Sequence, residues 1–436
     1  MRYFKPISIS LSPNVESDDI KLALSLIIRP WLWKKGKATK ELENEFKKYL
    51  GVKYAISFNS GRSSLFAILK VLSLPAQAGE VEGLKNGDEI FLQAFTCNAA
   101  VNPVLWQGFL PIYVDCDKDN FNIDIKDLNK KIVENHSAKI LMIQHTFGMP
   151  VNMEEIIYIV RQNNLILIED CAHSLGAEWN NQKVGTFGNV AFFSFSRDKV
   201  ISSVYGGMAV TNDDLIAEKL EKMQKEFGRP SYFWIFQQIL HPILLNYIIL
   251  PVYNFFDFGK IFLVLSQWFY ILSKAVHWKE KRGLKPDYFP KSLPNVLALL
   301  ALNQFKKIDK FYQHREEISK FYFENLKENS FSVSNDLSPE NLSSKNTKHS
   351  FLRFTVKHSK AHEIIYEACH KHNILLGDWY TTPIAPFDTN LDEMKYGLGT
   401  CPNAEELSKK TLNLPTHINI SQKDAEKIIN FLKKYF

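Results

Sequence analysis

The chain has 436 residues, of which 45% are hydrophobic and 23% charged, with a net charge of +6. This composition excludes a disordered chain, a collagen-like chain and a small disulfide-stapled protein. The charge excess is too small to favour nucleic-acid binding, but it suits a phosphorylated substrate or an anionic membrane surface. The five cysteines show no CxxC spacing, and the segment MRYFKPISISLSPNVESDD lacks the apolar core of a signal peptide. We therefore expect a cytoplasmic protein without disulfides or a bound metal.

Short apolar strands alternate with helices along the first half of the chain. Helices are predicted at 39–50, 62–72, 98–108, 125–134 and 153–163, and strands at 52–58, 88–93, 110–114, 138–144, 165–170, 191–196 and 207–211. This alternation predicts an α/β fold with a mostly parallel sheet covered by helices on both faces. In such sheets ligands bind at the carboxyl ends of the strands.

Further along the chain the pattern changes. An uncharged aromatic stretch begins at Ser231, a helical pattern resumes at Pro294, and residues 350–436 indicate a separate α+β unit. We predict a large domain over residues 1–290, with an apolar insert at about 231–278. A small C-terminal α+β domain is predicted over residues 291–436.

The residues that could bind a cofactor or take part in catalysis lie in the stretch 165–212. An apolar strand ends at Asp170, His173 follows in the same loop, and Ser194 ends the next strand shortly before Lys199. Pyridoxal phosphate chemistry needs a lysine, a carboxylate for the pyridine nitrogen, and hydroxyl or amide groups for the phosphate. Taken singly, these residues are ordinary: a solvated lysine, a helix cap, a buried histidine and a strand serine. Their joint occurrence in this order favours the cofactor.

The same stretch resembles a known family. The segments IEDCAHSLGA, VGTFGNVAFFSFSRDKVIS and YGGMAVTND are similar to motifs of the DegT/DnrJ/EryC1/StrS sugar aminotransferases. The segments LENEFKKYLGVKYAISFNSGRSSLFAIL, GDEIFLQAFTCNAAVNPVLWQGFLPIYVDCD, QHTFGMPVNMEEI and CPNAEELSKKTLNLPTHINISQKDAEKI extend the resemblance over most of 41–228 and 295–436. It implies the pyridoxal-phosphate-dependent type I fold, that of aspartate aminotransferase, and a homodimer with sites at the interface.

The resemblance also implies roles for residues around the cofactor. Lys199 falls on the lysine that forms the Schiff base, and Asp170 on the partner of the pyridine nitrogen. His173 falls near the ring hydroxyl, and Ser194 on the phosphate. Phe95 falls on the aromatic residue that covers the ring face, although a phenylalanine at such a position is more often a core residue.

A phosphate-binding turn is implied further upstream. Arg62 and Ser63 fall on a turn that opens a helix, where free amides and the helix dipole favour an anion. Family members usually have Thr at the position of Arg62. The segment FPKSLPN before Pro294 also departs from the family pattern, in which an Asn or Arg reaches the neighbouring subunit's cofactor. Lys291 or Ser292 is the candidate replacement.

The function implied is that of an aminotransferase. It moves an amino group, from L-glutamate, to a keto group of a nucleotide-linked sugar, in polysaccharide or secondary-metabolite biosynthesis. Arg229 and Arg353 are candidates for binding the donor carboxylate, and substrate recognition is expected in loops that include 381–393. Two alternatives stay open: a pyridoxal-phosphate-dependent sugar dehydratase, whose relatives commonly replace the lysine with His, and a non-catalytic membrane-associated regulatory protein on an aminotransferase scaffold. Lys199 argues against both.

The insert at about 231–278 has two interpretations. Polar residues such as Gln237, Gln238 and His241 interrupt its apolar run, so a full membrane span is disfavoured. Aromatic residues near its ends, followed by Lys279, fit a helical hairpin in a membrane interface, on the inner face of the membrane. The alternative is a subunit interface or an additional layer of the core.

Overall fold

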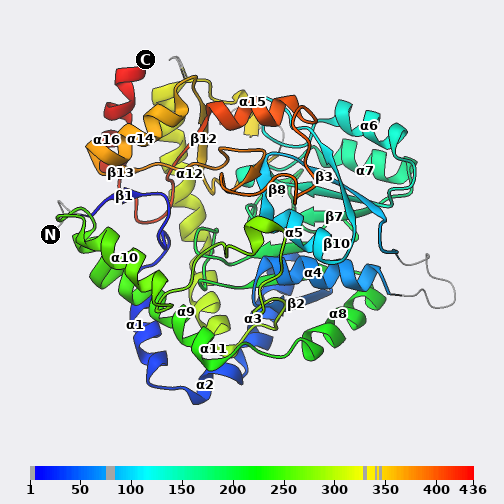
Figure 1. The fold of residues 1–436 in the computed structure, drawn as a ribbon, viewed down its shortest axis with the longest axis horizontal. Coiled ribbons are helices and arrows are strands. Elements are labelled where there is room, and N and C mark those ends of the chain that lie inside the picture. Colours follow the sequence, from blue (N-terminus) through cyan, green and yellow to red (C-terminus); the bar gives the residue numbers. More distant parts are fainter. Residues whose placement is uncertain (1–4, 75–83, 328–330, 339–340, 343–345) are drawn as a thin grey trace.

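The computed structural model describes residues 5–74, 84–327, 331–338, 341–342 and 346–436 (Figure 1). At its centre lies a seven-stranded sheet in the order β2-β11-β10-β7-β6-β3-β5. These strands are β2 (Tyr54–Phe58), β3 (Glu89–Gln93), β5 (Leu110–Val114), β6 (Ile140–Gln144), β7 (Ile166–Asp170), β10 (Val190–Ser194) and β11 (Gly207–Thr211). Only β11 runs antiparallel to its neighbours in this sheet, so the predicted mostly parallel α/β fold is confirmed.

Helices cover both faces of the sheet because successive strand residues point to opposite sides. On β7, Ile168 packs into a cluster with one set of helices and Leu167 into a cluster with another. The first set is α4 (Gly61–Leu72), α5 (Asn98–Trp106) and α8 (Asp214–Glu226). The opposite face is covered by α3 (Ala38–Leu50), α6 (Ile125–Glu134), α7 (Met153–Gln162) and α11 (Asn295–Phe305).

The helices begin and end at capping residues in the sequence. The side chains of Asp124, Asn152 and Asp213 accept backbone N–H groups in the first turns of α6, α7 and α8. Gly51 ends α3 with a φ of 74°, a left-handed conformation that favours glycine. The ends of α3, α6 and α7 fall within one residue of the sequence prediction, whereas α8 was not predicted.

A second core lies in the C-terminal part. It is built from α12 (Ile308–Leu326), α14 (Ala361–His372), α16 (Gln422–Leu432) and the antiparallel pair β12 (Phe354–Lys357) and β15 (Thr411–Leu414). The helix α11 packs in the core of the larger part. A domain boundary at residue 290 stays a prediction.

Short elements complete the structure. They are β1 (Ile7–Ser8), β4 (Thr96–Cys97), β8 (Glu178–Trp179), β9 (Gln182–Lys183), β13 (Ile374–Leu375), β14 (Ile384–Ala385), α1 (Ser17–Ile27), α2 (Trp31–Lys34), α15 (Pro402–Lys410), η1 (Thr146–Gly148), η4 (Glu280–Arg282), η5 (Asn335–Leu337) and η6 (Lys433–Tyr435). The strand β14 pairs with β4, which brings the chain near residue 384 to the carboxyl end of the sheet.

The N-terminal segment ties the two parts together. The strand β1 pairs with β13 of the C-terminal part. The Asn14 side chain donates to the backbone carbonyls of Lys199 and Val200 and accepts from Arg315 Nη2 at 2.7 Å. Asn14 therefore links the loop that carries Lys199 to helix α12.

The apolar insert forms two helices, α9 (Tyr232–Leu244) and α10 (Phe258–Trp268), joined by η2 (Leu245–Ile249) and η3 (Leu250–Val252). In Figure 1, α10 lies at the periphery of the molecule and α9 lies closer to α1 and α11. Among the described residues, one helical stretch, Tyr232–Val252, is long and apolar enough to cross a membrane. Because 56% of its most apolar window is buried within the protein, it also fits a core helix.

Candidate active site

A cavity of about 210 Å³ opens at the carboxyl ends of the parallel strands. Segments far apart in the sequence line it. They include Ser60–Arg62, Thr96, Cys97, Asp170, Ala172, His173, Ser194, Ser196–Lys199, Tyr205, Ala275, Val276, Asp378–Thr381 and Ala385–Phe387. Of the seven site residues predicted from sequence, five line this cavity: Lys199, Asp170, His173, Ser194 and Arg62.

Lys199 and Asp170 carry opposite charges in the same buried space. Burial lowers the pKa of Lys199 from 10.5 to about 8, although the Asp170 carboxylate acts in the opposite direction. Burial raises the pKa of Asp170 to about 6, while the backbone N–H of Ala172, at 2.9 Å from Oδ1, and the charge of Lys199 oppose the rise. Near pH 8 the lysine is therefore partly neutral, and the aspartate is ionised.

His173 forms part of the cavity wall as a neutral ring. Its Nδ1 accepts the backbone N–H of Phe147 at 3.2 Å, so the proton of the neutral ring lies on Nε2. Burial, followed by the charge of Lys199, lowers the pKa of His173 well below its usual value. The imidazole stacks on the Trp379 ring with centroids 5.2 Å apart.

The first turn of α4 lies against the end of β10. A Cβ atom on Gly61 would come within 3.0 Å of Ser194 Cβ, and one on Gly207 would lie 2.4 Å from the Ser60 carbonyl carbon. The approach at Gly207 requires glycine, and the one at Gly61 would be tight for any other residue. Both bring the helix N-terminus next to the Ser194 side chain. Amides at a helix N-terminus with a neighbouring hydroxyl form a typical phosphate site.

Two predicted residues lie outside the cavity lining. Ser63 is buried, and its hydroxyl donates to Asn59 Oδ1 at 2.6 Å while its N–H donates to the capping Ser60. Phe95 is also buried, and its ring centroid lies 5.8 Å from that of Phe121 and 5.4 Å from that of Tyr380, which lines the cavity. The next two residues, Thr96 and Cys97, line the cavity in its place.

Two arginines bring positive charge to the same side of the cavity. Arg62 forms an ion pair with Glu280, and its Nη2 donates to the Ala275 carbonyl at 3.0 Å. Burial by itself lowers the pKa of Arg62, but the Glu280 carboxylate has the larger effect, so the pKa of the guanidinium is raised. Arg197 Nη2 donates to the carbonyl and hydroxyl of Ser273, both at 2.7 Å.

Both arginines therefore bind one segment, residues 273–283, which follows α10 and which we call the strap. Asn102 Nδ2 donates to the Glu280 carbonyl at 2.9 Å, and Trp106 Nε1 donates to the Gly283 carbonyl at 2.9 Å. The strap thus closes one side of the cavity within a single chain. Lys279 was predicted to follow a helical hairpin in a membrane interface. The role of the strap becomes visible only from the ion pair between Arg62 and Glu280, which are more than two hundred residues apart in the sequence.

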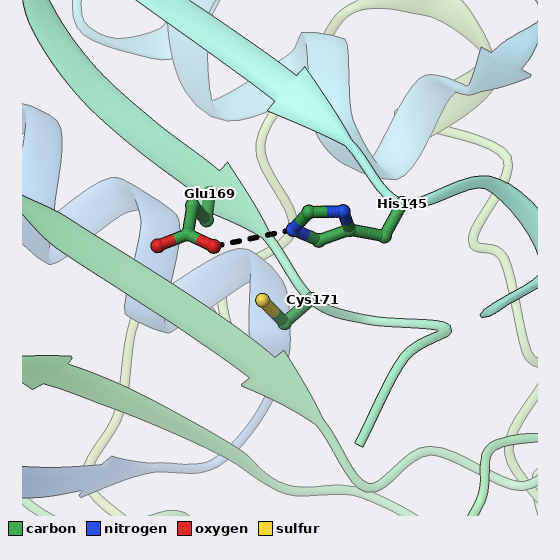
Figure 2. Close-up of side chains that lie close together, drawn as sticks. All are labelled: His145, Glu169 and Cys171. Carbon is green, nitrogen blue, oxygen red and sulfur yellow. Dashed lines mark hydrogen bonds and ion pairs between the residues drawn. The ribbon is translucent and has the colours of Figure 1, made fainter. Parts of the chain in front are cut away.

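His145, Glu169 and Cys171 form a buried cluster at the end of β7, where Glu169 and Cys171 flank Asp170 in the sequence (Figure 2). The Glu169 carboxylate accepts the backbone N–H groups of Gly185, Phe187 and Gly188 at 2.7–2.8 Å. It also lies 3.2 Å from His145 Nε2, and His145 Nδ1 accepts the backbone N–H of Val151. Both ring nitrogens are occupied, so this cluster fixes the end of β7 beside Asp170 and does not provide metal ligands.

The candidates for donor binding and for a contact with a second subunit have different environments. Arg229 is exposed, whereas Arg353 is buried with its guanidinium carbon 3.4 Å from the centroid of the Trp379 ring. Lys291 Nζ donates to the Phe227 carbonyl at 3.2 Å, and Ser292 Oγ donates to the Gly228 carbonyl at 2.8 Å. The last two side chains are thus bound within this chain.

Sequence reasoning missed Trp379. Its ring contacts His173 and Arg353, and Lys199 Nζ lies 4.8 Å from its centroid. No spacing rule connects this residue with Lys199, because the loop that carries it comes from the C-terminal part. Thr381 and Phe387, from the loop predicted to recognise the substrate, do line the cavity.

The residues present fit pyridoxal phosphate. A half-buried amine and a buried carboxylate line one cavity, and a helix N-terminus with Ser194 stands at its edge. Arg197 Nε is buried with no hydrogen-bond partner among the described residues, so this side of the cavity can accept a further anionic group.

Comparisons with known proteins agree with this arrangement. A sequence model of the DegT/DnrJ/EryC1/StrS aminotransferase family matches residues 14–234 and 282–433. The match leaves out residues 235–281, which include most of the apolar insert and most of the strap. An uncharacterized protein of Methanocaldococcus jannaschii is 27% identical over 430 residues, 97% of this chain and 96% of that protein.

A second relative and a solved structure have described roles. The GDP-perosamine synthase of Vibrio cholerae is 31% identical over 214 residues, which are 49% of this chain and 55% of that enzyme. The chain thus matches about half the length of that enzyme. The Helicobacter pylori aminotransferase PseC, involved in the biosynthesis of pseudoaminic acid, superimposes with a TM-score of 0.71 at 23% identity and covers 99% of each chain. This likeness confirms the aminotransferase fold.

Proposed function

Because this chain belongs to the DegT/DnrJ/EryC1/StrS aminotransferase family, we propose that it is a pyridoxal-phosphate-dependent aminotransferase acting on a nucleotide-linked ketosugar. The amino donor we propose is L-glutamate, and the pathway is polysaccharide biosynthesis. The observation that carries the proposal is that Lys199, Asp170 and Ser194 line one cavity with the first turn of α4. The V. cholerae relative, a GDP-perosamine synthase, supports a sugar substrate.

Each residue has a stated task in this proposal. Pyridoxal phosphate, when bound, supplies an aldehyde for a lysine amine and a ring that takes up electron density. Lys199 is the amine, Asp170 holds the pyridine nitrogen, and Ser194 with Gly61 and Arg62 holds the phosphate. Phe95 for the ring face and Ser63 for the phosphate turn also stay proposals, with neither side chain in the cavity lining.

Lys199 is also suited to proton transfer. With a pKa of about 8, its Nζ exists in both protonation states near neutral pH, so it can take a proton from the α-carbon of the amino donor and release it again. Asp170, ionised above pH 6, provides the negative charge on the far side of the cavity. The Trp379 ring lies beside Nζ and limits its exposure to water.

We propose Arg353 for the donor carboxylate. It is buried beside Trp379, whereas Arg229 is exposed. The charges of Asp198 and Asp378 oppose the effect of burial, which lowers the pKa of Arg353 to about 10, so the guanidinium stays cationic at neutral pH. We also propose a homodimer for this protein.

The test is amino transfer by the purified, cofactor-loaded protein. L-glutamate is supplied with a panel of nucleotide-linked ketosugars, and both 2-oxoglutarate and the mass of the sugar product are measured. We expect Lys199→Ala to lose the borohydride-reducible yellow chromophore and turnover, and Asp170→Ala to stay folded but lose nearly all turnover. Lys21→Ala, which changes an exposed lysine on α1, is the matched control and should behave as wild type.

Three outcomes would contradict the proposal. Turnover and colour in Lys199→Ala would remove the central residue. A sugar product that has lost a hydroxyl group without gaining nitrogen would indicate a dehydratase. A wild-type protein that does not retain the cofactor would indicate a non-catalytic scaffold.

A further inference from the structure

The helix α10 has its apolar side on the outside of the molecule. Its large exposed side chains are Phe258, Ile261, Phe262, Val264, Leu265, Trp268 and, just past its end, Phe269. At 100° per residue these positions fall within a stripe of about 160° on one side of the helix. Trp268 is 72% exposed and Phe269 is 67% exposed.

The side of α10 that faces the protein carries small residues. Gly259 and Ser266 are the buried residues of the helix, and a Cβ on Gly259 would lie 2.3 Å from the Ile249 carbonyl oxygen. Ser266 Oγ donates to the Leu263 carbonyl at 2.8 Å. A surface helix of a globular protein usually buries its large apolar residues, whereas α10 exposes them to solvent and packs its small residues against the protein.

The neighbouring surface is basic. The Asn254 side chain, just before α10, donates to the side chain of Asn373, which follows the last turn of α14. That turn carries His370, Lys371 and His372, and Lys434 Nζ lies 2.8 Å from His372 Nε2. The only acidic partner described there is Glu367, which pairs with both lysines.

The helix itself adds little negative charge. Asp257 is paired with Lys260 at 2.8 Å, and the next charged residue along the chain, Lys274, is exposed. Two lysines thus share the single Glu367 carboxylate, which leaves this surface with a net positive charge. An aromatic stripe beside a net positive charge is complementary to the headgroup region of an anionic bilayer.

The dimensions of the stripe disfavour a second copy of the chain. Eleven residues at 1.5 Å each give a helix face roughly 16 Å long and about 10 Å wide. A stable protein interface removes about 800 Å² from each partner. A bilayer needs no matching surface, because a single amphipathic helix can submerge its apolar face by about 5–10 Å.

We propose that α10 docks the protein on an anionic lipid bilayer, with its aromatic stripe among the lipid headgroups and the basic end of α14 facing anionic lipid. The helix lies in the interface and does not cross the membrane. The adjoining α9 stays in the core, because Trp234, Ile235 and Ile239 are packed there. The strap then lies between the docked helix and the cavity.

Flotation of the full-length, cofactor-loaded protein with lipid vesicles tests this proposal. Vesicles contain three parts phosphatidylcholine to one part phosphatidylglycerol, or phosphatidylcholine alone. We expect the wild type to float with the anionic vesicles, more weakly with the neutral ones, and the double variant Phe262→Glu/Trp268→Glu to lose roughly tenfold or more of the bound fraction. The matched control is Tyr158→Glu, which changes an exposed aromatic residue on α7.

Thermal unfolding and light scattering accompany each flotation. The two substituted side chains are already exposed, so the double variant should unfold as the wild type does, and Phe262→Ser/Trp268→Ser serves as a second variant if the glutamates impair folding. The proposal is overturned if the wild type does not float, or if the double variant floats equally well. It is also overturned if the wild type stays off the vesicles while the double variant changes a dimer into a monomer, because a second copy would then cover the stripe.

Discussion

The cavity and helix α10 both reverse the usual distribution of side chains in a soluble protein, but in opposite senses. Around the cavity, the charged groups of Lys199, Asp170 and Glu280 are buried. On α10, aromatic rings are exposed to solvent. Burying charged groups costs folding stability, and exposed aromatic rings forgo the stabilisation that burial would give them. Each arrangement therefore marks a place where the protein meets something other than water.

The difference lies in how the protein compensates. In the cavity, the strap places Glu280 against Arg62 and carbonyl oxygens against Arg197, so part of the burial cost of these charges is offset within the chain. On α10 no described side chain covers the stripe. The cavity wall is therefore completed by the strap of the same chain, whereas the apolar stripe of α10 is left for a partner outside the chain, the lipid bilayer in our proposal.

The largest effect on stability is expected at the strap. Glu280→Gln removes the carboxylate that pairs with the buried Arg62 guanidinium, and breaking a buried pair in this way costs about 3–5 kcal/mol of unfolding free energy. Denaturant unfolding of the purified protein measures this cost. The double variant Arg62→Met/Glu280→Gln removes both charges and should regain much of it. Equal losses in the single and double variants would contradict the role given to the pair.

A second prediction concerns the buried lysine. The neutral amine is the reactive form, so the rate at which cofactor-free protein captures pyridoxal phosphate should rise with pH to a midpoint near 8. At pH 7 about a tenth of the Lys199 amines are then neutral, about 300-fold more than at the ordinary value of 10.5. Stopped-flow absorbance measures the rate. A rate still rising tenfold per pH unit above pH 9 would show that burial leaves this amine unperturbed.

A third prediction, which includes the smallest expected effect, compares the same substitution in the two helices of the insert. Ile239→Ala in α9 creates a cavity in the core and should lower the unfolding free energy by about 2–5 kcal/mol. Ile261→Ala in α10 truncates a residue that is 51% exposed and should change the unfolding free energy by less than about 0.5 kcal/mol. Thermal or denaturant unfolding without lipid measures both. Similar losses in both variants would mean that α10 is covered in solution.

Much of the fold follows from local pattern. The apolar runs of β6 and β7 and the caps Asp124 and Asn152 fix their elements without help from distant residues, so their bounds were predicted closely. The insert could not be resolved in this way. Its two helices have similar composition, and which one is buried depends on packing against α1 and α11, which are distant in the sequence.

The residues of the candidate site also fall into two groups, those that the sequence predicts and those that only the tertiary fold reveals. Lys199, Asp170 and Ser194 are found from sequence because they lie within one stretch of chain and resemble a known pattern. Trp379 and Glu280 could not be found, because their partners are brought together only by the tertiary fold. Phe95 is outside the cavity lining, although the adjacent Thr96 and Cys97 belong to it. It lies between β3 and β4 with a φ of 61°, a local backbone feature that motif comparison does not show.

The contacts of Asn14 have a practical consequence for preparing the protein. A protease cut or deletion between β1 and α1 would release the amide that holds the Lys199 carbonyl and at the same time the oxygen that accepts from Arg315. Loss of activity after such trimming would then reflect a displaced loop and a loosened C-terminal part, with every cavity side chain still present. Affinity tags and fluorescent labels for this protein are therefore better attached after Phe436 than before Ile7.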